Sequence, residues 1–403
     1  EWSVVDIRFD DRNKLLGFTL RNEASEESTT YGEEGGEYFL FTIDVPSTSY
    51  LIQTKGMFHG GTREGKYNWL VSVDGGEPVL YSGASNTYGF SIPLGSAGEH
   101  TIKIEENITS GEQNTFQWFR AFGYGPNGSD TGLAKLVSPL PEKGMNVSEN
   151  NAGDYYAFQM FMSCNGASFT MGDAFTIPQS IETAGEGFCR EMFFGCTSPV
   201  FTMGKNFNLP QQITNITGND FCSGMFRDCT GNAFTMNSIF NLPQKITGTV
   251  GNSFCILMFV QCTGNAFTMN SIFNIPEGIT VVGNQFCTGM FQMCAGSAFT
   301  MNSKFNLPQN ITTVGTQFCS YMFHSSVFQV NSVFQFPKLS DTELNKADTI
   351  LDHVFMDVTA VQTRMAVSII NGNGAPNSDR DTFNSTGFGG GSDWSTLDSN
   401  WKQ

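Results

Sequence analysis

Basic residues are scarce in this chain, which has 21 Lys and Arg against 38 Asp and Glu among its 403 residues. The formal net charge of −17 and the pI near 4.6 argue against nucleic acid or an anionic membrane surface as a partner. No stretch approaches about 18 consecutive apolar residues, so the sequence predicts no transmembrane segment. A chain of this length is expected to form two or three domains.

Histidine is rarer still, and the positions of the histidines match no catalytic motif. The four histidines form no H-E-x-x-H or similar motif, and they stand at His59, His100, His324 and His353. The carboxylates show no EF-hand spacing, which leaves a calcium site in a loop as an open alternative. We therefore expect no enzyme, no catalytic residue and no cofactor.

The cysteines belong to an internal repeat. The unit reads F-C-x-x-M-F-x-x-C, a short polar stretch, and then A-F-T-M-N-x-x-F-N-L-P-x-x-I-T-x-x-G. Full copies of its first part begin at Phe188, Phe221, Phe254 and Phe286. A partial copy before them has Ala157 in place of the first cysteine, and one after them has Ser326 in place of the second.

The repeat predicts a solenoid. The phenylalanine of the M-F pair recurs every 32 or 33 residues, and a fixed period of this length indicates stacked supersecondary units. In the extended F-T-M segment, alternation directs Phe and Met inward and Thr outward. The outward threonines form a possible ligand-facing column of Thr170, Thr202, Thr235, Thr268 and Thr300. Phe188, Met192 and Phe193 lie at i, i+4 and i+5, so we expect a short helix there.

The cysteine count suggests disulfides between repeats. On a helix, the two cysteines of one unit lie seven residues and roughly 10 Å apart, whereas a disulfide needs Cα atoms within about 7 Å. Pairing within a unit would also leave Cys164 and Cys319 alone. Joining the second cysteine of each unit to the first of the next uses all ten. The predicted pairs are Cys164–Cys189, Cys196–Cys222, Cys229–Cys255, Cys262–Cys287 and Cys294–Cys319.

Such a ladder has consequences for stability and for location. Each bond closes a loop of about 25 residues, worth roughly 3 to 4 kcal/mol in the chain-entropy model. Disulfides at this density indicate an extracellular protein. Zinc is a weaker alternative, because structural zinc ligands are usually two to four residues apart and no histidine shares the period.

The chain divides into four parts. Residues 1–125 lack the repeat and alternate β-branched and aromatic runs with turn clusters, which predicts a β-sandwich. Residues 126–150 are interpreted as a linker or N-terminal cap, 151–370 as the repeat array, and 371–403 as a C-terminal cap or tail. The expected class is α+β multidomain, an all-β sandwich followed by an α/β leucine-rich-repeat-type solenoid with an inter-repeat disulfide ladder.

Two segments resemble known families. The run from Leu307 to Ser326 resembles the BspA-like leucine-rich repeat of bacterial surface proteins, and the M-F-x-x-C core is similar to a related surface-lipoprotein repeat. Residues 67–104 are similar to the PKD-type sandwich, with Val73-Asp74-Gly75-Gly76 at the family's Trp-Gly-Asp-Gly turn. These resemblances imply a surface-exposed, non-enzymatic protein used in adhesion or envelope structure.

The expected function follows from both lines of reasoning. We predict a secreted cell-surface rod, its signal peptide already removed, that binds a protein or glycan on another cell or matrix. The alternative is self-association into a surface layer or filament. The threonine column could be a ligand-binding or ice-binding ridge, or simply a solvated strand face. Possible glycosylation sites of the form N-x-S/T are Asn107, Asn127, Asn146, Asn215, Asn310 and Asn384.

Overall fold

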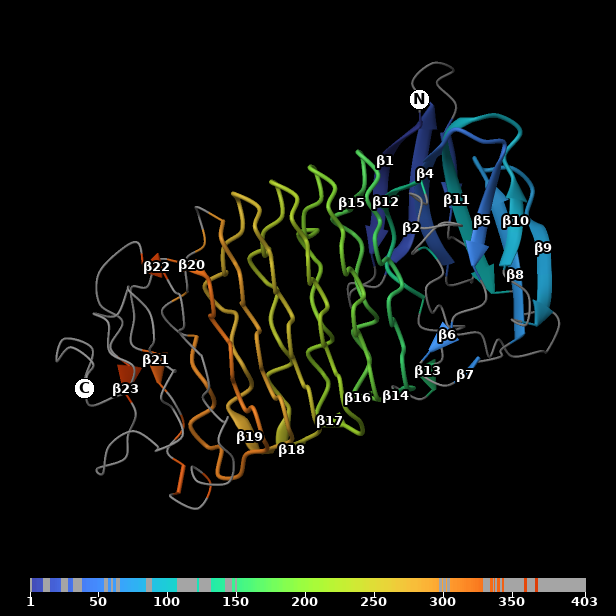
Figure 1. Ribbon diagram of the computed structural model, residues 1–403. Helices are drawn as coiled ribbons and strands as arrows, with labels where there is room; N and C mark the ends of the chain where they lie inside the picture. Colours follow the sequence, from blue (N-terminus) through green and yellow to red (C-terminus); the bar gives the residue numbers. More distant parts are fainter. Residues whose placement is uncertain are drawn as a thin grey trace.

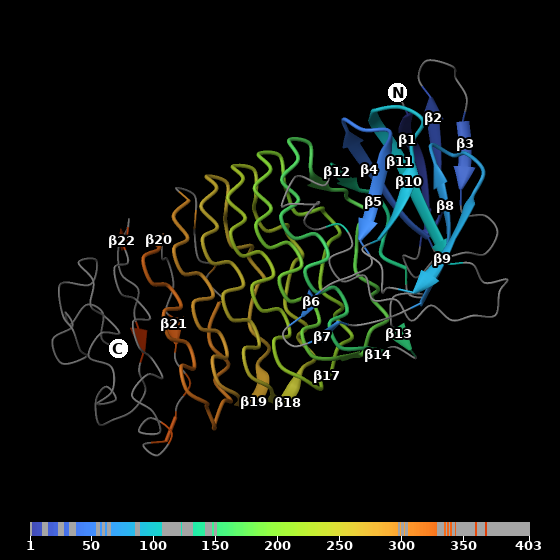
Figure 2. The ribbon, with the colours of Figure 1, turned by 45° about the vertical axis from the view of Figure 1, so that its right-hand side comes forward.

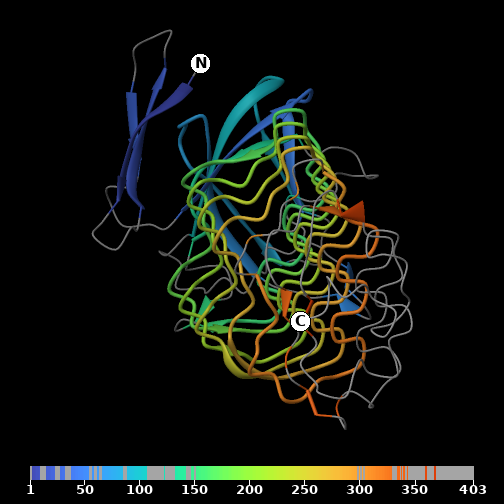
Figure 3. The ribbon, with the colours of Figure 1, turned by 90° about the vertical axis from the view of Figure 1, so that its left-hand side faces the viewer.

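In the computed structural model, β-sheets formed by the N-terminal part lie at one end of a stack of coils built by the repeat (Figure 1). Seen along the stack, successive coils nearly superimpose (Figure 3). The structure describes residues 2–9, 15–22, 28–31, 38–53, 57–58, 61–62, 66–84, 89–106, 122, 132–141, 147–148, 151–296, 299, 302, 305–328, 334–335, 337, 339–340, 343, 359–360 and 367–368.

A six-stranded sheet organises the N-terminal part. Its strand order is β15-β12-β4-β11-β8-β9, and the pair β5–β10 contributes buried residues such as Ile52 and Ile92 to the same core. Separate small antiparallel sheets are β1-β2-β3 and β6-β7. The strands are β1 (Trp2–Phe9), β2 (Leu15–Asn22), β3 (Ser28–Tyr31), β4 (Tyr38–Val45), β5 (Ser49–Gln53), β6 (Met57–Phe58), β7 (Gly61–Thr62), β8 (Lys66–Val73), β9 (Val79–Ala84), β10 (Gly89–Pro93), β11 (Gly98–Glu106) and β12 (Leu133–Leu136).

Strand β12 connects this sheet to the coils. It pairs antiparallel with β4, placing Leu136 opposite Phe41, and parallel with β15 of the first coil, placing Leu136 opposite Met171. The segment interpreted as a linker or cap therefore supplies a strand that belongs to both parts. Figure 2 shows β12 between the sheet and the first coil.

The coils contain only short strands. The I-T-x-x-G corners form the parallel pairs β14–β16, β16–β17 and β18–β19, and β13 pairs antiparallel with β14. Near the C-terminal end, β20 pairs with β22 and β21 with β23. The bounds are β13 (Val147–Ser148), β14 (Asn151–Ala152), β15 (Thr170–Met171), β16 (Thr183–Ala184), β17 (Asn215–Ile216), β18 (Thr247–Val250), β19 (Gly278–Val282), β20 (Val327–Phe328), β21 (Phe334–Gln335), β22 (Thr359–Ala360) and β23 (Val367–Ser368).

The predicted α+β class is wrong. No helix is delimited anywhere in the described part of the chain, and several small sheets replace the α/β leucine-rich-repeat-type solenoid. The F-C-x-x-M-F-x-x-C segments instead form what we call the turn ribbon, which consists of residues 155–164, 187–196, 220–229, 253–262, 285–294 and 317–326.

The backbone N–H groups of the turn ribbon donate alternately to a carbonyl of the same coil and to a carbonyl of the next coil. In the second segment, the N–H groups of Arg190, Met192, Phe194 and Cys196 donate to the carbonyl three residues before them. The intervening N–H groups donate to the following coil, as in Cys189 N to Phe221 O at 2.9 Å. These N–H groups thus find acceptors without an α-helix.

The first, fifth and ninth residues of each ribbon segment have positive φ, as in Gly187 at 60°, Glu191 at 54° and Gly195 at 70°. Most of these residues are not glycine, and the left-handed conformation costs them roughly 1–2 kcal/mol each. The ribbon buries its second, third, sixth, seventh and tenth residues, so its period is four. An apolar spacing of i, i+4 and i+5 suits this ribbon as well as a helix, which is why the helix prediction failed.

Columns of stacked phenylalanine rings form the core. In the central column, Phe193 and Phe226 lie 5.4 Å apart with rings 2° from parallel. Neighbouring columns meet edge to face, as in Phe226 and Phe240 at 5.6 Å and 84°. The central column is Phe161, Phe193, Phe226, Phe259, Phe291 and Phe323.

The N-terminal part completes the end of this column. The ring of Phe122 stacks on Phe161 at 5.6 Å, and the Phe122 N–H donates to the Met160 carbonyl at 3.1 Å. Phe39 of β4 also contacts Phe161, with ring centroids 6.4 Å apart. One hydrophobic core therefore extends from the six-stranded sheet into the coils.

Asparagine side chains hold the corners between coils. The amide of Asn270 donates to the Asn237 and Phe240 carbonyls of the preceding coil at 2.6 and 2.7 Å. Its oxygen accepts from the N–H of Phe273 in its own coil at 2.7 Å. Asn237 makes the equivalent contacts one coil earlier. This explains the repeated Asn of F-T-M-N without a ligand.

Replacing Phe226 with alanine should lower the free energy of unfolding by about 3–5 kcal/mol, because it leaves a cavity where columns meet. The outward, half-buried Phe194 is a matched control, and its replacement should cost about 1 kcal/mol. Chemical denaturation of both variants tests this. Equal losses would contradict the assignment of the central column as the main packing element.

Candidate functional site

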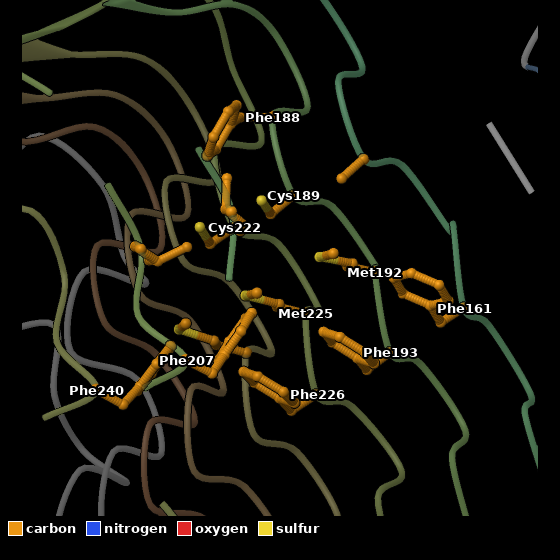
Figure 4. Packing of buried hydrophobic residues seen from close by; sticks show 14 of the residues in the cluster. Phe161, Phe188, Cys189, Met192, Phe193, Phe207, Cys222, Met225, Phe226 and Phe240 are labelled. Atoms are coloured by element: carbon orange, nitrogen blue, oxygen red, sulfur yellow. The ribbon is translucent and has the colours of Figure 1, made fainter. Parts of the chain in front are cut away.

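The ten cysteines are the most concentrated chemical groups in the structure, and all are fully buried free thiols. They lie in two columns along the stack. The Ala–Cys column comprises Ala157, Cys189, Cys222, Cys255, Cys287 and Cys319, at the third ribbon position. The Cys–Ser column comprises Cys164, Cys196, Cys229, Cys262, Cys294 and Ser326, at the tenth. Figure 4 shows Cys189 and Cys222 at equivalent positions of successive coils.

Thiols of the Cys–Ser column are hydrogen-bond donors. The Sγ of Cys229 donates to the Phe193 carbonyl of the preceding coil at 3.3 Å, and that of Cys262 to Phe226 at 3.3 Å. At the end of the column, the Ser326 hydroxyl donates in the same way to Phe291 at 2.5 Å. Serine thus performs the role of the cysteine it replaces.

The Ala–Cys column has no such requirement. The Sγ of Cys255 and that of Cys287 lie 3.7 Å from the carbonyls of Phe286 and Phe318. Those carbonyls already accept from the backbone N–H of the same cysteines at 2.9 and 3.1 Å. Ala157, which has no polar side-chain atom, opens the column.

The predicted disulfides Cys164–Cys189, Cys196–Cys222, Cys229–Cys255, Cys262–Cys287 and Cys294–Cys319 are not formed in the structure. The two cysteines of each predicted pair lie in different columns, and each cysteine instead faces its equivalent in the next coil. Cys196 contacts Cys164 and Cys222 contacts Cys189. The absent first and last cysteines, which suggested the pairing, are replaced by residues that suit the two columns.

Burial makes the thiols poor nucleophiles. Desolvation raises the pKa of Cys196, Cys222 and Cys255 above the ordinary thiol value, and it does the same for Cys229, Cys262, Cys287 and Cys294. Because only the thiolate attacks or binds metal readily, these side chains are inert while the coils are closed. Among the described residues, no group of three or more His, Cys, Asp or Glu could hold a metal ion.

The threonine column hydrogen-bonds along itself. Thr170, Thr202, Thr235 and Thr268 are half-buried, and the hydroxyls of Thr235 and Thr268 are 2.9 Å apart. The Thr235 hydroxyl also accepts from the Thr268 N–H at 3.1 Å. The inward Phe and Met and the outward Thr follow the predicted alternation. Thr300 lies outside the described residues, and a ligand for this column stays a prediction.

Two histidines lie in the described residues. The Nδ1 of His100 is 2.6 Å from an Asp74 carboxylate oxygen, and the other oxygen accepts from the Thr101 N–H at 2.7 Å. These contacts fix the Asp74 turn against β11. The Nδ1 of His324 is 3.2 Å from the Gln292 amide. His59 and His353 lie outside the described residues.

Two of the six predicted glycosylation sites lie in the described residues. Asn215 and Asn310 are exposed, whereas Asn107, Asn127, Asn146 and Asn384 lie outside the described residues, as does the expected tail of residues 371–403.

A recess of about 260 Å³ is lined by residues that include Asp44, Gly132 and Ser168, and Asp44 supplies its single carboxylate. Within the described residues, no helix has the length and apolar character needed to cross a bilayer.

The outer face of the turn ribbon was missed by sequence reasoning. Its fourth, fifth, eighth and ninth residues differ from coil to coil and are half-buried or exposed in some coils and buried in others, while the residues at the core positions repeat. Half-buried apolar side chains on this face are Phe194, Ile256, Leu257, Met293 and Tyr321. Arg190, which lies on the same face, donates to the Asp220 carboxylate of the next coil at 2.8 Å. Its guanidinium group also lies over the Phe158 ring. The two glycines at Gly187 and Gly195, eight residues apart, were the sequence signal for left-handed backbone in this segment, and Glu191 halfway between them has the same conformation.

Comparison with known proteins identifies no relative. No family model, no curated protein and no solved structure matches this chain.

Folded, reduced protein should react negligibly with a thiol-specific reagent, and raising the pH from about 7 to 9 should accelerate labelling little, because every cysteine is fully buried. Denaturant should release all ten thiols for labelling. Mass spectrometry of the labelled chain measures both. Rapid labelling of the folded chain would contradict the burial of the columns.

The two columns should tolerate serine and alanine in opposite order. Cys229→Ser keeps the bond that Ser326 makes, so it should be more stable than Cys229→Ala by about 1 kcal/mol. Cys222→Ala resembles Ala157, and it should be more stable than Cys222→Ser by about 1–3 kcal/mol, because the Phe254 carbonyl already accepts the backbone N–H of residue 222 and the buried hydroxyl would lose its hydrogen bonds to water. Thermal unfolding ranks the four variants. The same order in both columns would refute their distinct roles.

Proposed function

We propose that this protein is a non-enzymatic, extracellular cell-surface rod that binds a protein on another cell or in the surrounding matrix. The outer face of the turn ribbon is its binding surface. The observation that carries the proposal is the contrast within the ribbon between repeated buried residues and varied outward ones. Such a division keeps the coils stackable while it allows the surface to specify a partner.

The composition of this face supports a protein partner. Aromatic residues, Met and Arg are enriched at protein interfaces, and the face offers Phe194, Tyr321, Met293 and Arg227. Arg227 lies over the Phe194 ring at 5.2 Å, so part of the face is already ordered before a partner arrives. Preordered side chains lose less entropy on binding.

Two further points support this reading. The M-F-x-x-C repeat resembles those of bacterial surface proteins, for which adhesion is the implied role. Phe122 covers the N-terminal end of the central phenylalanine column, which makes end-to-end stacking of coils less favourable than binding along the side. Self-assembly into a layer or filament is the alternative that the experiment below distinguishes.

A triple variant, Phe194→Ser, Leu257→Ser and Tyr321→Ser, should lose at least about tenfold in affinity for the cells or matrix proteins that the unaltered chain binds, because interface energy concentrates in a few aromatic and apolar residues. Binding of the labelled protein to immobilised matrix proteins and to intact cells measures this. The matched control is Ile239→Ser with Ile272→Ser, which alters two side chains, 39% and 40% exposed, outside the ribbon.

Equal binding by both variants, or no binding by the unaltered chain, would contradict the proposal. Light scattering and negative-stain microscopy at rising concentration complete the test. Regular polymers would favour the structural alternative, whereas a monomer that binds supports the adhesive one.

A further inference from the structure

We infer that the Ala–Cys column is an oxidation site in which equivalent cysteines of adjacent coils form the disulfides Cys189–Cys222 and Cys287–Cys319, while the Cys–Ser column stays reduced. This inference rests on the thiol columns and is independent of the proposed function.

The stacking brings equivalent cysteines within bonding range. Cys189 N donates to Phe221 O at 2.9 Å, and the adjacent rings of Phe188 and Phe221 are 5.4 Å apart. Strands hydrogen-bonded in this way are about 4.8 Å apart, and disulfides span Cα separations of about 4.4–6.8 Å. Coils that include Cys287 and Cys319 are related in the same way, with Cys287 N donating to Phe318 O at 3.1 Å.

Within the Ala–Cys column, two pairs of thiols lie close enough to interact. They are Cys189 with Cys222 and Cys287 with Cys319. Both sulfurs of the first pair lie side by side in Figure 4. A column of five cysteines can form two bonds, and the central Cys255 is the one left over.

The thiol hydrogen bonds are shorter in the Cys–Ser column than in the Ala–Cys column, where the thiols of Cys255 and Cys287 lie 3.7 Å from carbonyls that already accept a backbone N–H. Oxidation removes the S–H, which in the Cys–Ser column would break the bonds to the Phe161, Phe193, Phe226 and Phe259 carbonyls. Cys164 and Cys196 also touch, but each donates its S–H to a carbonyl, at 3.3 and 3.2 Å. At the third ribbon position, Ala157 shows that the fold requires no donor.

The chemistry needs an oxidant and an open chain. Two thiols lose two protons and two electrons as the S–S bond forms, and a small-molecule disulfide such as oxidised glutathione accepts them and is split into two thiols. Because the closed coils bury the thiols completely, the exchange takes place during folding. Once closed, the stack protects both the disulfides and the remaining thiols.

The experiment is refolding of the full chain with oxidised and reduced glutathione, followed by alkylation of free thiols. Digestion without reduction, by a protease that cleaves after phenylalanine, separates the cysteines for mass spectrometry. We expect a chain lighter by four hydrogen atoms, two cross-linked peptides that contain Cys189 with Cys222 and Cys287 with Cys319, and six alkylated cysteines of the ten.

Two variants sharpen the assignment. Cys189→Ala, which copies the residue at Ala157, should lose the first bond and keep Cys287–Cys319. Cys196→Ser, which copies the residue at Ser326, should keep both. Bonds between the columns, bonds within the Cys–Ser column, or ten alkylated cysteines after refolding would each overturn the inference.

Discussion

The in-register stacking of near-identical coils is the constraint on which the rest of the structure depends. Backbone N–H groups of one coil donate to carbonyls of the next, which sets a spacing that parallel phenylalanine rings also fit. A side chain at one position therefore contacts its own equivalent above and below. Residues that pack well against copies of themselves, such as Phe, Met, Cys and Asn, are the ones that the repeat retains.

The same constraint explains the chemistry of the cysteines. Stacking places like next to like, so the thiols form two columns with different surroundings rather than a ladder of cross-links between columns. In the Cys–Ser column each thiol satisfies a carbonyl, while in the Ala–Cys column it fills space. The end residues show the same difference. Ser326 keeps a hydrogen-bond donor in the Cys–Ser column, and Ala157 keeps a small apolar side chain in the Ala–Cys column.

Core and surface positions are separated within the turn ribbon. The second, third, sixth, seventh and tenth ribbon residues are buried in every described coil, whereas Leu257 and Tyr321 at the fifth position are half-buried. The six-stranded sheet adds a rigid end, since β12 joins β4 to the first coil.

Much of the organisation followed from the sequence by itself. The period of 32 or 33 residues, the inward Phe and Met around Thr235, and a β-rich N-terminal part are local patterns that one chain displays along its length. The helix at Phe188 and the disulfide from Cys164 to Cys189 were predicted as well, and the structure has neither.

Tertiary structure decided those two points because both depend on contacts between coils. The spacing of Phe188, Met192 and Phe193 fits a helix and a ribbon with period four equally, and only the hydrogen bonds to the next coil favour the left-handed conformation at Glu191. The partner of Cys189 depends on which residue lies above it in the stack. A sequence repeat shows that the units have the same structure. Packing between the coils determines how adjacent units are aligned, and therefore which residues of adjacent units contact each other.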